Sequence, residues 1–150
     1  MKFICKALKK DFTVSKLEGL WRFDEEKFGK FSITETPGKV NRTEWEYRLL
    51  IRMPEFVTNE MTDNAIKTVM TKKKIQKVEN IKLYSMKEGK CVQMLHIGPF
   101  DTEPQTLKQM DEFMQSKKLG KNGIHHEIYL SDFRKTSPEK LKTILREPVK

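Results

Sequence analysis

The side chains of this sequence that are best placed to do chemistry lie between Gly123 and Leu130, a stretch that reads Gly-Ile-His-His-Glu-Ile-Tyr-Leu. Its alternation predicts a strand with His125, Glu127 and Tyr129 on one face and aliphatic side chains on the other. If the first face is covered, Glu127 must be hydrogen-bonded, paired or protonated, because an isolated buried carboxylate is very costly. If it lines a cleft, Glu127 and Tyr129 form a polar anchor in an aromatic wall. An amphipathic strand with that face in water is the alternative that the periodicity leaves open.

Aromatic residues of other predicted strands could complete such a wall, namely Trp21, Trp45 and Tyr47. An acid among aromatic rings suits apolar ligands with a cationic or electrophilic centre, because the rings attract cations and the carboxylate supplies a charged contact. Glu127 could also act as a general acid or base if burial raises its pKa towards neutrality. For Trp21, a role as core filler is the alternative.

Patterns that bind metals, phosphates or acyl groups are missing from the sequence. It contains no glycine-rich phosphate loop, no His-x-x-x-His or Cys-x-x-Cys spacing, and no Gly-x-Ser-x-Gly nucleophile turn. His125 and His126 are adjacent, so their rings point to opposite faces of a strand and do not easily share one metal. We therefore predict no metal site and no cofactor.

The length and composition predict one ordinary globular domain. The chain has 150 residues, of which 37% are hydrophobic and 34% charged, and no apolar run approaches the length of a membrane span. The first ten residues become charged again too soon for a signal peptide, so a cytoplasmic protein without a membrane partner is expected. Cys5 and Cys91 are then expected to be free thiols.

A formal net charge of +9 raises the question of a polyanionic partner. The lysine clusters at residues 9–10, 72–74 and 117–118 lie on separate segments, and acidic residues are interspersed through most of the chain. Neither a helix-turn-helix pattern nor an aromatic RNA-binding signature accompanies them. We therefore expect a solvated basic surface and no direct nucleic-acid partner.

Two predicted strands carry the aromatic candidates. Thr43 to Met53 is the clearest strand, because aromatic and aliphatic residues alternate there mostly with charged ones. The segment Leu17 to Trp21 has Gly19 among apolar residues, which suits a bulge or a close backbone approach.

Helices and a hairpin are predicted for the rest of the chain. Thr58 can cap a helix with an apolar stripe at helical spacing, and Thr102 with Gln105 suggests a capping box for a second helix. Between them, Ile81 to Met86 and Cys91 to Gly98 are predicted to pair as a hairpin. The result is an α+β fold, an antiparallel sheet with helices on one face.

A further set of candidate ligand-binding residues follows from the second hairpin strand. Met94 and His96 share one face of it, and Phe100 lies just beyond its end. For His96, a satisfied structural histidine and a ligand contact are both open. Strand-turn-strand-helix occurs twice, at Phe31 to Met70 and Ile81 to Leu119, so two similar halves would leave a groove where they meet.

Several segments carry a family resemblance. They read Cys-Val-Gln-Met-Leu-His-Ile-Gly-Pro-Phe-Asp-Thr-Glu-Pro at 91–104, His-Glu-Ile-Tyr-Leu-Ser-Asp at 126–132, Pro-Glu-Lys-Leu-Lys-Thr-Ile-Leu-Arg at 138–146, Leu-Glu-Gly-Leu-Trp at 17–21 and Ile-Arg-Met-Pro-Glu-Phe-Val at 51–57. Together they resemble the GyrI-like small-molecule-binding family over nearly the whole chain from Leu17 onward.

The resemblance implies two strand-helix-strand-strand modules in a pseudo-twofold arrangement, with a ligand groove between them. Members of the family include effector domains of multidrug-responsive transcription activators, stand-alone proteins that protect DNA gyrase from inhibitors, and a branch that hydrolyses cyclopropane-bearing DNA-alkylating natural products. The family's pocket glutamate and tyrosine match Glu127 and Tyr129, and its aromatic wall would fall on Trp21 and Tyr47. In the hydrolytic branch, Glu127 would be the general base that positions water, and Tyr129 or Tyr47 a proton donor or orienting group.

This sequence departs from the family pattern at its start. The first module of the family usually opens with a strand and a helix, and here only Met1 to Lys16 precede the Leu-Glu-Gly-Leu-Trp segment. A first module shortened at the N-terminus would leave a sheet edge and apolar surface uncovered, which favours a homodimer.

We therefore expect residues 1–150 to form a single GyrI-like ligand-binding domain of a type linked to multidrug or toxin resistance. Its ligands would be bulky apolar or cationic or electrophilic compounds held in a central groove. A hydrolase that opens the cyclopropane ring of DNA-alkylating natural products is the first alternative, with Glu127 and Tyr129 as its catalytic residues. A protein-binding module of the type that protects gyrase is the second.

Overall fold

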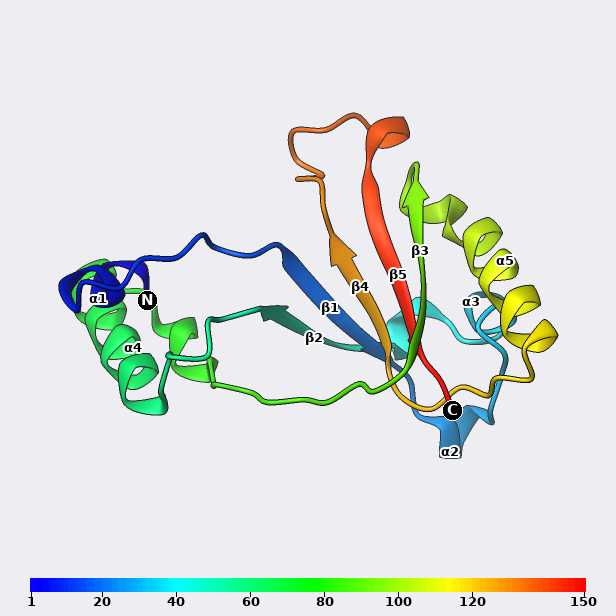
Figure 1. Cartoon of the computed structure of the whole chain (residues 1–150), viewed down its shortest axis with the longest axis horizontal. Coiled ribbons are helices and arrows are strands. Elements are labelled where there is room, and N and C mark those ends of the chain that lie inside the picture. Colours follow the sequence, from blue (N-terminus) through cyan, green and yellow to red (C-terminus); the bar gives the residue numbers. More distant parts are fainter. The chain divides into compact units, whose positions relative to one another are not determined.

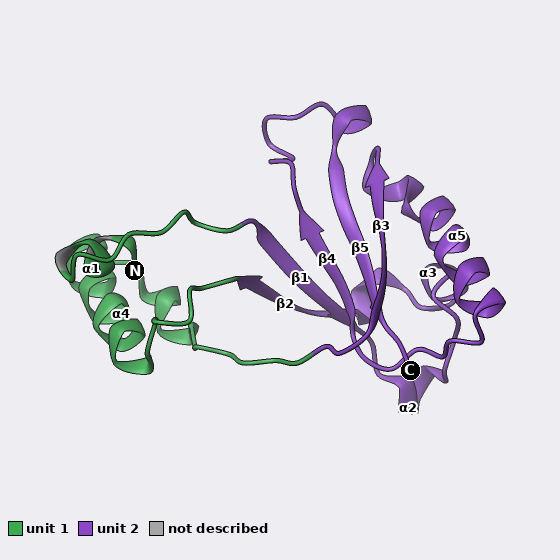
Figure 2. Ribbon diagram, viewed as in Figure 1, with its two compact units in different colours: residues 1–15, 52–87 green, residues 16–51, 88–150 purple. Residues whose placement is uncertain are grey.

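The computed structural model describes residues 1–2, 4–6 and 8–150. The chain divides into two compact units (Figure 2). One consists of residues 1–15 and 52–87, and the other of residues 16–51 and 88–150. All the candidate site residues belong to the second unit.

The first unit is helical. It contains α1 (Lys2–Ala7), α4 (Asn59–Lys73) and a short 3-10 helix, Gln76–Asn80. The Thr58 side chain accepts a hydrogen bond from the Met61 backbone N–H, as the sequence predicts, and Lys74 ends α4 in the left-handed conformation. Among the described residues, no helix has both the length and the apolar character needed to span a bilayer.

The second unit is built on a five-stranded sheet. Its strands are β1 (Leu17–Arg22), β2 (Glu46–Ile51), β3 (Cys91–Ile97), β4 (His125–Tyr129) and β5 (Lys142–Pro148). Their order is β2-β1-β4-β5-β3, and every pairing is antiparallel. The predicted α+β class with an antiparallel sheet is confirmed.

Helix α5 (Glu103–Ser116) covers one face of this sheet and lies beside β3 (Figure 1). The buried core under it combines Leu107, Met110 and Met114 of the helix with Leu145 of β5. These helix positions recur at spacings of three and four, which is the stripe that a helix must bury against a sheet. The remaining short helices are α2 (Glu25–Phe28), α3 (Thr36–Lys39) and three 3-10 helices, Arg42–Glu44, Phe100–Thr102 and Pro138–Lys140.

The second predicted module is present as β3, α5, β4 and β5. Of the first module, the sheet holds β1 and β2. In the sheet, β1 of the first module lies next to β4 of the second, with β2 on one side of this pair and β5 on the other. The second module has a third strand, β3, beyond β5, whereas among the described residues no strand of the first module lies beyond β2. The outer edge of β2 therefore has no ladder partner within the described chain.

Three sequence predictions are wrong. The strand-turn-strand-helix unit predicted twice is absent, because residues 31–41 and 81–86 contain no strand. Residues 82–89 form no strand, and β3 pairs with β5 in place of a hairpin with Ile81 to Met86. The alternation of residues 81–86 is a local pattern that favours a strand, but β5, which is distant in sequence, occupies the position beside β3 in the sheet. The capping box at Thr102 is also wrong, because its hydroxyl donates a hydrogen bond to the Pro99 carbonyl and caps no N–H of α5.

Candidate functional site

Strand β4 places His125, Glu127 and Tyr129 on the side of the sheet that α5 covers. Glu127 lies opposite Leu145 of β5, whose side chain is in the core under α5, and opposite Gly19 of β1. Because side chains alternate along a strand, His125 and Tyr129 point to the same side as Glu127. The predicted strand and the predicted grouping of these three side chains are therefore present in the structure.

Gly19 makes room for the side chains that meet above it. A Cβ atom at this position would lie 2.8 Å from Trp21 Nε1 and 2.8 Å from the Tyr129 hydroxyl. The pairing of β1 with both neighbours runs through Gly19 without interruption, so the glycine serves a close approach and makes no bulge.

A chain of hydrogen bonds orients the carboxylate of Glu127. The Trp21 indole N–H donates to the Tyr129 oxygen at 2.9 Å, and the Tyr129 hydroxyl donates to Glu127 Oε2 at 2.7 Å. Burial first, and then the negative charge of Glu127, raise the pKa of the Tyr129 hydroxyl. Tyr129 is therefore held as a protonated donor towards the carboxylate.

His125 connects Glu127 to a second buried carboxylate. Its Nε2 lies 3.5 Å from Glu127 Oε1, and its Nδ1 is hydrogen-bonded to Glu147 Oε2 at 2.7 Å. Burial lowers the pKa of His125, but its hydrogen bonds to the two carboxylates outweigh burial and raise the pKa to about 9. His125 is then an imidazolium at neutral pH, which donates from Nδ1 to Glu147 and forms an ion pair through Nε2 with Glu127. Lys121 Nζ, 3.7 Å from Glu147 Oε1, supplies the second positive charge.

Glu103, the first residue of α5, adds a carboxyl group of a different kind. Its side chain is 8% exposed, and among the described residues its Oε1 has no hydrogen-bond partner. Burial first, and then the charge of Glu127, raise the pKa of Glu103 to about 8, against the opposing charges of His125 and Arg42. Glu103 is therefore mostly protonated at neutral pH.

Sequence reasoning missed Glu103. A glutamate at the start of a helix is normally explained by the helix dipole, and such residues are usually in water. Nothing local to Asp-Thr-Glu-Pro indicates that this side chain is buried. The one available signal was its place in the segment 91–104 that carries the family resemblance.

Aromatic and aliphatic side chains flank these carboxyl groups. The ring of Tyr47 lies 5.4 Å from the ring of Trp21, and the ring of Phe100 lies 6.1 Å from that of Tyr129, edge to face. Tyr47 is 63% exposed, and Leu49 and Ile51 on the same face of β2 are 53% and 48% exposed. An open apolar surface therefore adjoins the buried carboxyl groups.

The structure places the three other candidate residues in different surroundings. Trp45 donates its indole N–H to the Val40 carbonyl and lies 5.8 Å from the ring of Phe23. Met94 packs against the core under α5. His96 is buried and bonds through Nδ1 to the Thr106 hydroxyl at 2.9 Å, which is the contact of a structural histidine.

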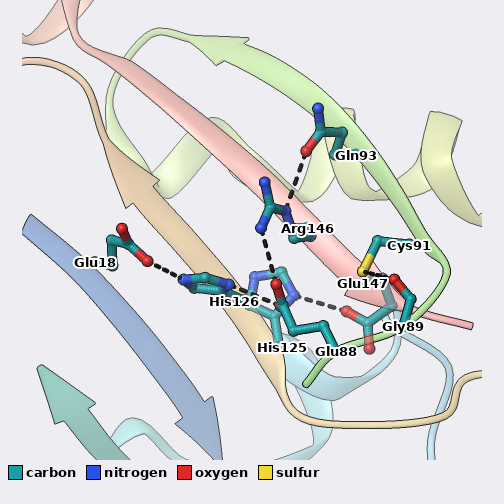
Figure 3. A network of polar contacts seen from close by, with 9 residues as sticks. All are labelled: Glu18, Glu88, Gly89, Cys91, Gln93, His125, His126, Arg146 and Glu147. Atoms are coloured by element: carbon teal, nitrogen blue, oxygen red, sulfur yellow. Dashed lines mark hydrogen bonds and ion pairs between the residues drawn. The ribbon is translucent and has the colours of Figure 1, made fainter. Parts of the chain in front are cut away.

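On the opposite face of the sheet, His126 is the centre of a separate charged network (Figure 3). This ring is 1% exposed, and its nitrogens lie 2.9 Å from Glu18 Oε2 and 2.8 Å from Glu88 Oε1. Arg146 Nη1 donates to Glu88 Oε2 at 2.8 Å, and Arg146 Nε donates to Gln93. The charged network, as we call Glu18, Glu88, His126 and Arg146, joins segments far apart in the sequence.

The chain belongs to the GyrI-like family of small-molecule-binding domains. The family model, described as a GyrI-like small molecule binding domain, matches residues 54–150. A comparison with curated proteins finds no match.

Solved structures from Listeria innocua resemble the whole fold. One, an uncharacterized conserved protein, is 41% identical with a TM-score of 0.81, over 94% of this chain and 66% of its own. Another, described as a hydrolase, is 38% identical with a TM-score of 0.78, over 94% of this chain and 65% of its own. The chain thus spans just under two thirds of the length of these proteins.

Proposed function

We propose that this domain binds bulky, largely apolar compounds with a cationic or electrophilic centre on the face of β1, β2 and β4 around Glu127. The observation that carries the proposal is the hydrogen-bonded series Trp21, Tyr129 and Glu127 beside an open apolar surface. It supplies a carboxylate of fixed orientation within reach of aromatic rings, and both features attract cations.

The charges around Glu127 support this preference. His125 neutralises Glu147 and Glu127 in part, but Lys121 lies next to Glu147, on the far side of His125 from Glu127. Exposed apolar side chains of β2 provide the area against which a bulky ligand would be desolvated. A ligand cation packed against these side chains would therefore lie next to the carboxyl group of Glu127.

Calorimetric titration with methyltriphenylphosphonium, a bulky aromatic cation, tests the proposal. We expect binding by the wild type and a loss of about tenfold to a hundredfold in affinity in Glu127→Gln, since a charged contact contributes about 1–3 kcal/mol. Glu112→Gln, at an exposed position of α5, is the matched control and should bind like the wild type. Equal affinity in all three proteins would remove Glu127 from the site.

Hydrolysis is the second candidate function, favoured by two neighbouring carboxyl groups of different character. Glu127 accepts a hydrogen bond from Tyr129 and could take a proton from water, whereas Glu103 is mostly protonated at neutral pH and could return one. Two of the similar Listeria structures are described as hydrolases.

With a cyclopropane-bearing electrophile, the step would be water addition with ring opening. The water oxygen bonds to a ring carbon, a strained C–C bond breaks, and its electron pair moves into the conjugated carbonyl, which takes up a proton. Mass spectrometry of the product measures turnover. A Glu127→Ala, Tyr129→Phe double variant that turns over as fast as the wild type would rule out this chemistry at the site.

A further inference from the structure

Glu103 is the carboxyl group of the site that binding at Glu127 alone does not explain. It is buried at the start of α5, and its Oε1 lacks a hydrogen-bond partner among the described residues. A buried polar atom without a partner costs free energy, so it is expected where a ligand or a charge change gives it a role. The site therefore holds two acids: Glu127, which accepts a hydrogen bond from Tyr129, and the buried Glu103, whose Oε1 has no partner in the described part of the chain and can bind a ligand group.

We propose that Glu103 adjusts the charge of the ligand site, staying protonated in the empty site and with neutral ligands and releasing its proton when a cationic ligand enters. This inference rests on the proposed function, because it assumes that ligands bind beside Glu127. It goes further by stating that one site accepts both neutral and cationic compounds.

The groups that act on Glu103 make such a change feasible. Glu127 and burial favour the neutral carboxyl group, while His125 and Arg42 favour the ionised one. A bound cation adds a positive charge to the second set, so it shifts the balance towards ionisation. By thermodynamic linkage, ionisation of Glu103 must strengthen the binding of the cation by the same factor.

With a neutral ligand, the protonated form has a different use. A protonated carboxyl group offers one O–H donor and keeps acceptor capacity on its other oxygen. It could donate to a carbonyl or phosphoryl oxygen of a neutral compound, and this contact would satisfy the group that is unpaired in the described structure. Raising the pH would then remove the donor and weaken neutral binding.

Two near-isosteric probes separate these cases: methyltriphenylphosphonium, which is a cation, and triphenylphosphine oxide, which is neutral. Between pH 6 and pH 8 we expect the affinity of the wild type for the cation to rise by up to about 50-fold. The reason is that the ionised fraction of a carboxyl group with a pKa of about 8 rises by this factor over the same pH range. The affinity for the neutral probe should not rise. Calorimetry in buffers of different ionisation enthalpy should show close to one proton, about 0.9, released per cation bound at pH 7.

Variants identify the titrating group. Glu103→Gln should lose both the proton release and the rise of cation affinity with pH, because an amide cannot ionise. Glu112→Gln, exposed on the same helix, should keep both. The wild-type titrations need no variant, so the inference can be tested even if Glu103→Gln folds poorly.

Each outcome decides between the two claims. Cation binding that is independent of pH and releases no proton would overturn the role of Glu103 and leave the proposed function intact. A Glu103→Gln protein that still releases the proton would assign it to another group and overturn the inference as well. If neither probe binds the wild type, the proposed function fails and the inference fails with it.

Discussion

Gly19 shows how a single residue without a side chain fixes the geometry of the site. A methyl group here would lie 2.8 Å from both Trp21 Nε1 and the Tyr129 hydroxyl, so these two side chains would have to separate. We predict that Gly19→Ala destabilises the domain by about 1–3 kcal/mol, the usual cost of overpacking, and weakens cation binding. Urea unfolding and calorimetry measure the two effects.

Gly38→Ala is the control for this substitution. No heavy atom lies within 4 Å of a Cβ at Gly38, which belongs to the short helix α3. Alanine there should be neutral or slightly stabilising, since it favours helix over glycine. If Gly19→Ala were as stable as Gly38→Ala and bound ligand normally, the close approach above β1 would have no functional importance.

Glu103 predicts a pH dependence of stability that can be separated from ligand binding. Its folded pKa of about 8 lies above the ordinary value of 4.5, so between these values the folded state holds more protons than the unfolded state. The contribution of Glu103 to the free energy of unfolding is therefore largest below pH 4.5 and falls as the pH rises towards 8. We predict that Glu103→Gln is more stable than the wild type by about 4 kcal/mol at pH 7.5, roughly 1.4 kcal/mol for each pH unit above 4.5, and nearly equal at pH 4.5.

Chemical unfolding at the two pH values measures this difference. The upper limit of pH 7.5 keeps the comparison below the pKa of about 9 of His125. A wild-type protein as stable as Glu103→Gln at pH 7.5 would show that Glu103 ionises without penalty, contrary to its burial.

At the scale of elements, the charged network ties β1, β4 and β5 together on the face away from α5. Its members are partly or wholly shielded from water, with Glu88 17% and Glu18 15% exposed at their side chains. Removing one charge from such a network leaves the others uncompensated. We predict that Glu88→Gln destabilises the domain by about 2–4 kcal/mol and speeds amide hydrogen exchange in β4 and β5.

An exposed glutamate provides the comparison for Glu88. Glu25→Gln, at the start of α2, should change stability by less than about 0.5 kcal/mol, as surface substitutions usually do. If the two variants had equal stability and equal exchange in β4 and β5, the charged network would not hold these strands together.

Sequence reasoning recovered the elements that have a strong local pattern. The strand with Glu127, the strand β2, and the helix that Thr58 caps were all predicted, because alternation, helical spacing and caps are local properties. The partner of β3 could not be predicted, because strand pairing is decided by the whole sheet. The same holds for Glu103 and for the network around His126, in which Glu18 bonds to a ring 108 residues further along the chain.

For the whole molecule, the order of the sheet leaves β2 as an edge strand with exposed Tyr47, Leu49 and Ile51. Homodimer formation, which the sequence suggested, therefore stays a prediction. Antiparallel pairing of two β2 strands centred on Leu49 would place Tyr47 opposite Ile51 and Glu46 opposite Arg52, a register that matches apolar with apolar and acid with base.

Light scattering tests this pairing. We expect a mass near twice the 17.8 kDa of the chain for the wild type and the monomer mass for Leu49→Lys, since that change sets like charges opposite each other at the centre of the pairing. Lys108→Leu, at an exposed position of α5, is a control that should not change the mass. A monomeric wild type would contradict the prediction.

The most direct measurement of ligand binding at the site uses the indole N–H signals of the two tryptophans in a ¹H–¹⁵N correlation spectrum. Trp21 donates to Tyr129 within the site, whereas Trp45 donates to the Val40 carbonyl outside it. A Trp21→Phe spectrum assigns the two signals. On titration with methyltriphenylphosphonium, the Trp21 signal should shift to saturation while the Trp45 signal stays in place. If Trp21 does not shift while ligand binds, or if only Trp45 shifts, the ligand does not bind at Glu127 and Tyr129.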